Sequence, residues 1–257
     1  PMHGTMELRE QIVDLIAKQY NRNLDPHEVL VTAGATQAIF TTIQALVHQG
    51  QEVLILDPSY DCYEAPIQLS GALPVRIPLD HNFKPDWSRI AAAITPKTRM
   101  LITNNPHNPS GTIWDAHDYL ALEALMQAHP ELILLSDEVY EYITFDDAFK
   151  SINEYPTIRD RAIIVSSFGK TFHITGWKMG YLVCAPELMN EIHKVHQFLV
   201  FSVNSVAQHA LSLYLAQVDI QSLAHFYQQK RDFFRGGLAK SRLELLPAQG
   251  SYFQVAS

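Results

Sequence analysis

The sequence predicts an α/β protein whose mostly parallel sheet is sandwiched between helices. Three observations support this prediction. The chain has 257 residues, of which 47% are hydrophobic and 18% charged, as in a globular protein with one large core. Short runs that are apolar on both faces alternate with segments of helical period, which is typical of parallel strands joined by crossover helices. Polar clusters follow directly after these runs.

The predicted elements follow one another in a regular order. An amphipathic helix comes first, because Leu8, Ile12 and Ile16 recur at helical spacing, and Asp25-Pro26 then breaks the pattern. Helical periodicity marks three further stretches, 36–47, 115–126 and 186 to about 237. The strand-like runs are 29–31, 53–56, 100–103, 132–135, 162–165, 181–183 and a strand-rich segment that begins at 242 and includes 251–255.

Charge and cysteine content narrow the class of partner. The formal net charge is −8 and Lys and Arg form no dense run, which argues against nucleic acid or an anionic membrane as the main partner and favours small molecules. Cys62 and Cys184 have no metal-ligand spacing, so neither a zinc site nor a disulfide framework is indicated, and no metal is expected. No apolar run approaches the ~18 residues of a membrane span, and a cytoplasmic protein is expected.

Five polar clusters are predicted to meet at one edge of the sheet. In open α/β sheets the ligand crevice lies outside the carboxyl ends of the strands, so clusters that each follow a strand-like run converge on one site. The clusters are TAGATQ (32–37), DPSYD (57–61), NNPHNP (104–109), SDEVY (136–140) and SSFGK (166–170).

The first cluster offers a candidate anion-binding site, and the fourth offers a buried acid. Ala35 and Thr36 open a helix directly after a strand, where free backbone N–H groups bind phosphate well, although such a turn is more often only a helix cap. Asp137 follows an apolar run, so its carboxylate is expected at a buried edge, where it needs a cation or hydrogen-bond donors; a helix cap is the alternative. Glu138 is expected to face solvent or a helix.

The second cluster carries a tyrosine, the third carries asparagines, and the fourth ends in a tyrosine. Asn104 and Asn108 lie in the doubly prolyl turn NNPHNPSG, which would hold their amides in place, with turn formation as the alternative role. His107 beside them is expected to be a turn or surface residue. Tyr60 would lay its ring against a planar ligand and Tyr140 would offer a phenol to an anionic oxygen, or either would belong to the core.

Two lysines stand out in the stretch SSFGKTFHITGWKMGY (166–181). A solvated loop would normally carry acidic and amide neighbours as well, whereas this stretch is otherwise aromatic, small and hydroxyl-bearing. One amine could bind a carbonyl cofactor as a Schiff base while the other pairs with a phosphate as a point charge, so Lys170 and Lys178 are candidates for these roles. Taken singly, most lysines are solvated surface charges.

In order and at similar spacing, the motifs TAGATQA, DPSYDCY, NNPHNPSG, SDEVY and SSFGKTFHITGWKMGY resemble those of fold-type I, class I/II pyridoxal-phosphate aminotransferases. The resemblance covers nearly the whole chain and is strongest to the bacterial methionine aminotransferase and kynurenine/glutamine aminotransferase group. It implies a seven-stranded type of sheet in a large cofactor-binding domain over 1–240 and the start of a small α+β domain over 241–257. It also implies pyridoxal 5′-phosphate as cofactor, an amino acid and a 2-oxo acid as substrates, and a homodimer with shared active sites.

The resemblance implies a role for each lysine and for the turn residues around them. Lys170 matches the lysine that binds the cofactor covalently and serves as general base and acid, and Lys178 matches the lysine that contacts the cofactor phosphate. Ala35, Thr36 and Ser167 would complete the phosphate cup.

The remaining matches surround the cofactor ring. Tyr60 would stack on the ring, while Asn108 and Tyr140 would bind its phenolic oxygen. Asp137 matches the carboxylate that meets the ring nitrogen, and an anion there favours the cationic ring that accepts electrons. Asn104 lines the same cavity in relatives, so Asn104 and Asn108 are also expected to contact substrate.

Two parts of the family pattern lie outside this sequence. The arginine that grips the substrate carboxylate belongs to the C-terminal domain, and the tyrosine that reaches the partner's phosphate would stand just before Pro1, so a fragment of a longer enzyme is expected. A looser match places Phe201 at a dimer interface. Methionine or aromatic amino acids are the expected substrates. Two alternatives stay open: a carbon–sulfur lyase of the cystathionine β-lyase type and a non-catalytic effector domain of a transcription regulator.

Overall fold

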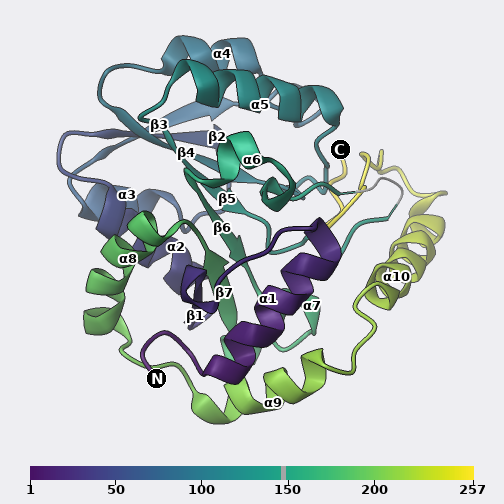
Figure 1. The fold of residues 1–257 in the computed structure, drawn as a ribbon. Coiled ribbons are helices and arrows are strands. Elements are labelled where there is room, and N and C mark those ends of the chain that lie inside the picture. Colours follow the sequence, from purple (N-terminus) through teal and green to yellow (C-terminus); the bar gives the residue numbers. More distant parts are fainter. Residues whose placement is uncertain (146–148) are drawn as a thin grey trace.

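The computed structural model describes residues 1–145 and 149–257, and a seven-stranded sheet forms the centre of this part of the chain (Figure 1). The strand order is β1-β7-β6-β5-β4-β2-β3. β7 is antiparallel to β1 and β6, and the other neighbouring strands are parallel, which confirms the predicted mostly parallel sheet. The strands are β1 (Val29–Thr32), β2 (Glu52–Asp57), β3 (Leu73–Pro78), β4 (Thr98–Asn104), β5 (Ile133–Asp137), β6 (Ala162–Ser166) and β7 (Gly180–Val183).

Helices cover both faces of the sheet. One apolar core lies between the sheet and a layer that includes α1, α5 and α9, and the second lies between the sheet and α2, α3 and α8 (Figure 1). Within the described residues, no helix combines the length and the apolar character that a bilayer crossing requires. The helices are α1 (Met6–Tyr20), α2 (Ala35–Leu46), α3 (Glu64–Leu69), α4 (Trp87–Ala93), α5 (Ala116–Ala128), α6 (Pro156–Arg159), α7 (Phe168–Thr171), α8 (Pro186–Leu199), α9 (Ser205–Leu215) and α10 (Ser222–Leu238).

Successive residues of the inner strands point into opposite cores. In β5, Leu134 packs in the core on the side of α1 and α5, whereas Ile133 and Leu135 pack in the core on the side of α2 and α8. Because both faces of the strand are covered, its first three positions are all apolar, and the strand lacks the polar alternation of a half-exposed sheet. This is the physical reason why the inner strands can be predicted from continuous apolar runs.

The edge strand β3 was not predicted. It pairs only with β2, contains Pro74, Arg76 and Pro78, and is largely exposed to solvent. Proline and charged side chains are tolerated at a sheet edge, where one side of the strand needs no hydrogen-bonding partner. The resulting sequence lacks the continuous apolar run that marks the inner strands.

The direction of β7 brings the two lysines to the same edge of the sheet. β6 ends at Ser166 and β7 begins at Gly180, so the connection of the two antiparallel strands stays at the carboxyl edge of the parallel strands. Lys170 lies in α7 and Lys178 ends the short 3-10 helix η3 (Thr175–Trp177), both within this connection. A parallel crossover would instead have carried the chain to the opposite edge.

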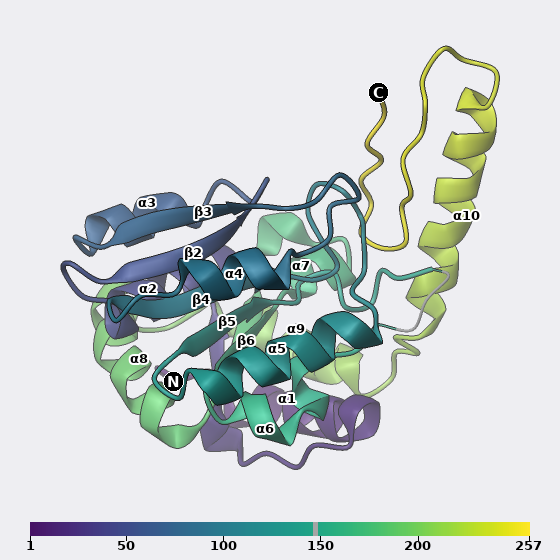
Figure 2. The same ribbon diagram turned by 90° about the horizontal axis from the view of Figure 1, so that it is seen from above.

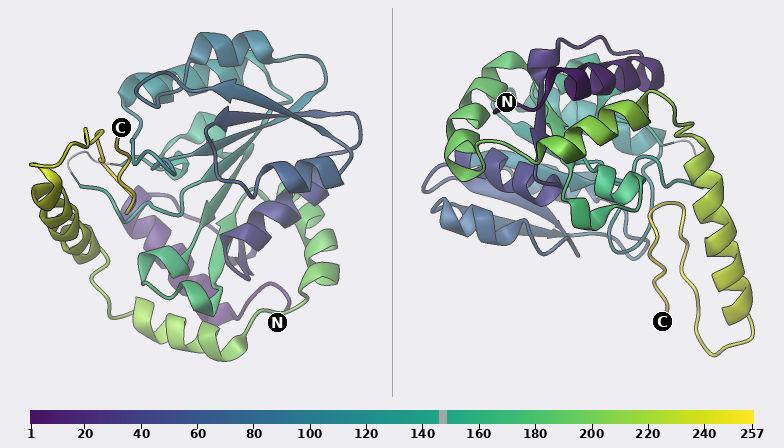
Figure 3. Two further views of the ribbon diagram at one scale, coloured as in Figure 1. Left: turned by 180° about the vertical axis from the view of Figure 1, so that it is seen from behind. Right: turned by 90° about the horizontal axis from the view of Figure 1, so that it is seen from below.

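The C-terminal helix α10 leaves the body of the protein, and part of the chain after it returns to contact the body (Figure 2). α10 projects outward, and the segment after it runs back beside the helix (Figures 2 and 3). The predicted strand-rich segment from 242, including 251–255, is wrong: in the described chain this segment makes the isolated bridges Thr144↔Gly250 and Leu245↔Ala256 and belongs to no strand of the sheet. Two short extended stretches without a third partner are too weakly paired to form regular strands.

Candidate active site

A cavity of about 220 Å³ opens at the carboxyl edge of the parallel strands. Every site residue proposed from the sequence lines it, which supports the expectation that the five polar clusters converge on one site. The structure adds residues that the motifs did not single out, including Met179 and Phe253. The lining residues are Gly34, Ala35, Thr36, Tyr60, Asn104, Asn108, Asp137, Val139, Tyr140, Ser167, Gly169, Lys170, Thr175, Lys178, Met179 and Phe253.

One end of the cavity is an anion-binding corner. α2 begins at Ala35, and the first N–H groups of a helix have no partners within the helix and carry the positive end of its dipole. The amine of Lys178 lies beside this helix start, since a Cβ built on Gly34 would be 3.8 Å from Lys178 Nζ. A helix N-terminus and an ammonium group together favour a phosphate or another small anion.

Gly180 allows this corner to form. A Cβ at this position would lie 2.8 Å from the carbonyl oxygen of Ser166 and 3.0 Å from the backbone nitrogen of Ala35. The first distance is shorter than real Cβ contacts show and the second is tighter than nearly all of them, and both involve backbone atoms that cannot rotate away. Glycine at the start of β7 therefore lets the strand pass directly against the N-terminus of α2.

The cavity lining also includes a buried carboxylate. Asp137 ends β5 and is 3% exposed, and it accepts hydrogen bonds from Tyr63 Oη at 2.6 Å and from the backbone N–H of Val139 at 3.3 Å. Burial raises the pKa of Asp137 to about 6, while the two hydrogen bonds and the charge of Lys170 act in the opposite direction. Tyr63 was missed by the sequence reasoning, although it is the second tyrosine of the DPSYDCY motif.

The asparagines tie the prolyl turn to the end of β5. Asn104 Nδ2 donates to the carbonyl oxygen of Asp137 at 3.0 Å, and Asn104 Oδ1 accepts from the backbone N–H of Asn108 at 2.7 Å. The predicted rigid turn is thus confirmed, and Asn104 fixes its position against the strand end. Asn108 lines the cavity next to this anchor.

Lys170 extends from α7 toward an aromatic wall. Its Nζ donates a hydrogen bond to Tyr252 Oη at 2.8 Å and lies 5.8 Å from the ring centroid of Tyr140. Burial, followed by the neighbouring Tyr252, raises the pKa of the Tyr140 phenol far above its ordinary value, so Tyr140 stays protonated. Tyr252 comes from the C-terminal segment, and no local motif in the sequence pointed to it.

Glu138 meets the start of the short 3-10 helix η2 (Ile152–Glu154), one of its two expected settings, but neither Glu138 nor His107 is exposed to solvent. Glu138 is buried, and it accepts hydrogen bonds from Ser151 Oγ at 2.5 Å and the Ile152 N–H at 3.0 Å, while burial raises its pKa to about 8. His107 is a turn residue as expected but is buried, bonded to Ser110 Oγ at 2.7 Å and to a backbone carbonyl at 2.9 Å. Burial lowers the pKa of His107 to about 4, and it is not among the described residues that line the cavity.

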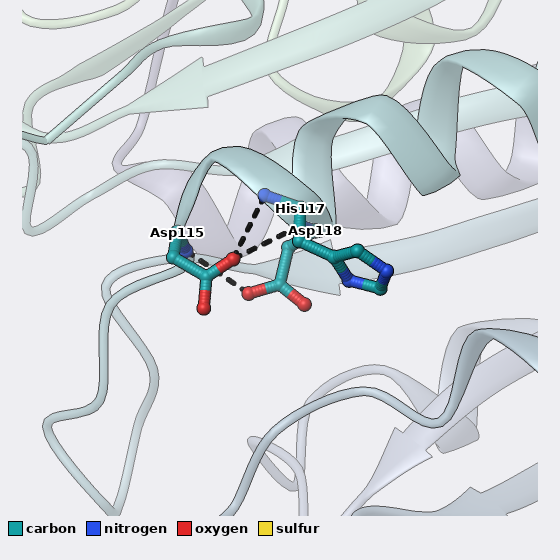
Figure 4. Close-up of side chains that lie close together, drawn as sticks. All are labelled: Asp115, His117 and Asp118. Atoms are coloured by element: carbon teal, nitrogen blue, oxygen red, sulfur yellow. Dashed lines mark hydrogen bonds between the residues drawn. The ribbon is translucent and has the colours of Figure 1, made fainter.

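A cluster of Asp115, His117 and Asp118 at the start of α5 has side chains close enough to hold an ion (Figure 4). Its hydrogen bonds explain it as a helix cap, because Asp115 accepts from the N–H groups of His117 and Asp118, and Asp118 accepts from the N–H of Asp115. Asp118 also accepts from Lys84 at 3.3 Å and from Trp87 Nε1 at 3.0 Å. The Lys84 ammonium pairs with both carboxylates and offsets part of their charge, and the cluster is not among the described residues that line the cavity.

Comparison with known proteins places the whole chain in one family, since residues 1–257 match the family model for aminotransferases of class I and II. The chain belongs to this family. Its sequence is 46% identical to methionine aminotransferase of Escherichia coli K12 over 98% of this chain and 67% of that enzyme. It is 32% identical to kynurenine–oxoglutarate transaminase of Dictyostelium discoideum over 97% of this chain and 63% of that enzyme.

Solved structures of aminotransferases match the fold over the whole length of the chain. A methionine aminotransferase from Escherichia coli superposes with a TM-score of 0.97 at 45% identity, covering 100% of this chain and 68% of that one. N-succinyldiaminopimelate aminotransferase from Mycobacterium tuberculosis has a TM-score of 0.93 at 33% identity, covering 98% and 67%. The chain therefore spans about two thirds of the length of these aminotransferases. Enzymes of this family depend in general on pyridoxal phosphate and act on amino acids and 2-oxo acids.

Proposed function

We propose that this chain binds pyridoxal 5′-phosphate in the cavity and transfers an amino group from an L-amino acid to a 2-oxo acid. The observation that carries the proposal is the convergence of three groups on one cavity: the amine of Lys170, the buried carboxylate of Asp137 and the anion-binding corner at Lys178. An aldehyde, a ring nitrogen and a phosphate are the features of the cofactor that these groups fit.

The phosphate would occupy the anion-binding corner. The backbone N–H groups at Ala35 and Thr36 and the ammonium of Lys178 supply hydrogen bonds and positive charge, and Ser167 lines the same cavity with a hydroxyl. This set of donors is neutral or cationic throughout, which suits a dianion.

The ring would lie between the aromatic and polar walls. Asp137 would pair with the protonated ring nitrogen, and that cation would hold the carboxylate in its charged form by lowering the pKa that burial raises. Tyr60 offers a face for stacking, and Asn108 and Tyr140 offer donors for the phenolic oxygen. When bound, the cofactor supplies an electron sink for the bonds of the substrate Cα.

Lys170 would hold the cofactor covalently and then move protons. Its primary amine is the nucleophile that a carbonyl cofactor needs, and once the amino acid has taken its place the free Nζ can accept the Cα proton and return one as general base and acid. Tyr140, Asp137 and Lys170 thus form the proposed catalytic set, and Asn104 and Asn108 would contact substrate.

The organisation around the site is also a proposal. The region 1–240 would be the large cofactor-binding domain and 241–257 the beginning of a smaller one, in a homodimer with shared sites. Phe201 is 64% exposed and is not among the described lining residues, so a contact with a second copy would suit it. The 46% identity to methionine aminotransferase supports methionine or an aromatic amino acid as the amino donor.

Isotope transfer tests this function. The chain is loaded with pyridoxal 5′-phosphate and given 15N-labelled L-methionine or L-phenylalanine with an unlabelled 2-oxo acid. We expect 15N in the amino acid formed from the acceptor, and none with Lys170→Ala. Pyruvate and a thiol released from cystathionine without an acceptor would instead identify a carbon–sulfur lyase, and absence of both reactions would support a non-catalytic role.

A further inference from the structure

We propose that Tyr252 is a positioning residue for the amine of Lys170, which it holds whenever that amine is not bonded to the cofactor. The inference rests on the proposed function, because it concerns the stage at which free Lys170 moves the Cα proton. It adds a residue from the C-terminal segment to a site otherwise built at the ends of the strands.

The geometry around the amine is specific. Lys170 Nζ donates to Tyr252 Oη at 2.8 Å and lies 5.5 Å from the centroid of the Tyr252 ring and 5.8 Å from that of Tyr140. The two rings meet edge to face with centroids 5.4 Å apart. The amine is therefore flanked by two phenol rings and hydrogen-bonded to one of them.

Backbone hydrogen bonds hold the segment that carries Tyr252 against the body of the protein. The N–H groups of Gln249 and Gly250 both donate to the carbonyl oxygen of Gly111 at 2.8 Å, and the N–H of Ser251 donates to the carbonyl oxygen of Ile143 at 2.8 Å. Their partners belong to the prolyl turn after β4 and to the loop after β5, which also carry site residues. These hydrogen bonds thus fix the position of Tyr252 relative to the cavity.

Close packing and an unusual backbone conformation fix the same segment. A Cβ on Gly250 would lie 2.8 Å from Cβ of Pro106 and 3.0 Å from the carbonyl oxygen of Ile143, so a larger residue does not fit. Ser251 is fully buried and has φ +60°, in the left-handed region that residues other than glycine rarely adopt. Such conformations persist where the surroundings enforce them and are frequent at functional sites.

The hydrogen bond limits where the Lys170 amine can go. A lysine side chain has four rotatable bonds and samples many positions when its end is free. A neutral amine that donates one N–H to Tyr252 directs its lone pair away from that phenol and keeps its nitrogen next to Tyr140, inside the cavity lining. Proton transfer depends steeply on such placement of the base.

Tyr227 provides a matched control. Its ring packs against Tyr252 with centroids 6.0 Å apart, but its hydroxyl is hydrogen-bonded to His173 Nδ1 at 2.7 Å rather than to Lys170. Tyr252→Phe and Tyr227→Phe each remove one hydroxyl from the same aromatic cluster. Only the first removes the bond to the amine.

The first arm of the test uses the cofactor-free chain. Acetic anhydride labelling followed by peptide mass analysis reports the reactivity of the Lys170 amine, with Lys178 as an internal reference in the same digest. We expect Tyr252→Phe to raise labelling of Lys170 relative to Lys178 by about two- to tenfold, the range set by one neutral hydrogen bond, and Tyr227→Phe to leave it unchanged. Equal labelling in the two variants would overturn the inference.

The second arm uses the chain loaded with pyridoxal 5′-phosphate and follows exchange of the amino acid Cα proton with D₂O by NMR. We expect Tyr252→Phe to slow exchange about tenfold, to raise the primary isotope effect of a Cα-deuterated donor and to leave cofactor affinity unchanged. If Tyr252→Phe exchanged the Cα proton as fast as Tyr227→Phe, the role of Tyr252 would be overturned while the proposed function would stand. Absence of exchange in the wild-type chain would overturn the proposed function and this role with it.

Discussion

The phenol of Tyr63 donates a hydrogen bond of 2.6 Å to the carboxylate of Asp137, and both side chains are almost completely buried. Burial favours the protonated carboxyl group and raises its pKa to about 6, whereas the bond from Tyr63 favours the charged form. Near neutral pH, the charge of Asp137 thus depends on Tyr63, which is not itself among the described residues that line the cavity. This pair suggests the first test.

Tyr63→Phe should raise the pKa of Asp137 above about 6, because it removes the largest effect that opposes burial. As the solution is acidified, the affinity for pyridoxal 5′-phosphate should therefore begin to fall at a higher pH in the variant than in the wild-type chain. In that pH range the affinity of the variant should be lower by about tenfold or more, as expected for the loss of a hydrogen bond to a charged group. Absorbance titration with pyridoxal 5′-phosphate from pH 5 to 9 measures this. Tyr155→Phe, outside the cavity lining, is the control. If cofactor binding by Tyr63→Phe and by Tyr155→Phe depended on pH in the same way, the prediction would be contradicted.

Gly180→Ala should damage the anion-binding corner. The new methyl group would lie 2.8 Å from the carbonyl oxygen of Ser166 in β6 and 3.0 Å from the backbone nitrogen of Ala35, which forces β7 away from β6 and from the start of α2. We expect a loss of about 1–3 kcal/mol of stability, typical of overpacking, together with weaker binding of inorganic phosphate. Urea denaturation and phosphate titration measure the two effects.

The control for that substitution is Gly237→Ala in α10. A Cβ there would meet no described atom within 4 Å, and alanine is favoured over glycine in a helix by about 0.5–1 kcal/mol. This variant should be slightly more stable than the wild-type chain. If both alanine variants changed stability in the same direction, the close approach at Gly180 would not be the cause.

Stability should fall as pH rises from 6.5 to 8. Burial raises the pKa of Glu138 to about 8 and that of Glu141 to about 7, both above the ordinary value of 4.5. In this window the folded chain holds more protons than the unfolded chain, so the free energy of unfolding decreases with pH, on the order of 1–2 kcal/mol for Glu138. Glu138→Gln should flatten this slope in urea denaturation without cofactor. An equal slope in the variant would contradict the prediction.

The acidic side should show the opposite slope. Burial lowers the pKa of His107 and of His193 to about 4, below the ordinary 6.5. Between these values the unfolded chain binds more protons, so these histidines make the protein less stable as pH falls toward 4. His107→Gln should weaken this acid sensitivity, and melting temperatures between pH 4 and 6.5 measure it. An undiminished loss on acidification would rule out His107 as a source.

Local patterns were sufficient to predict the inner strands and the residues that follow them. The antiparallel direction of β7 could not be predicted, because it depends on pairing between distant residues such as Val29 and Val183. β3 was missed because an exposed edge strand has no need of a continuous apolar sequence.

The same limit explains what was missed at the site. Tyr63 and Tyr252 act through contacts with Asp137 and Lys170, which lie 74 and 82 positions away in the sequence. The burial of Glu138 depends on the hydroxyl of Ser151 and a distant backbone amide, which no motif around SDEVY indicates. The residues proposed to bind the ligand lie in local motifs, whereas the residues that support them were visible only in the folded chain.

Reductive trapping tests the assignment of Lys170 most directly. The chain loaded with pyridoxal 5′-phosphate is reduced with borohydride and digested, and the peptides are analysed by mass spectrometry. We predict that the cofactor is attached to Lys170 and not to Lys178, and that Lys170→Ala abolishes attachment while its circular dichroism matches the wild-type chain. Attachment to another lysine, or to none, would contradict the proposed role of this cavity.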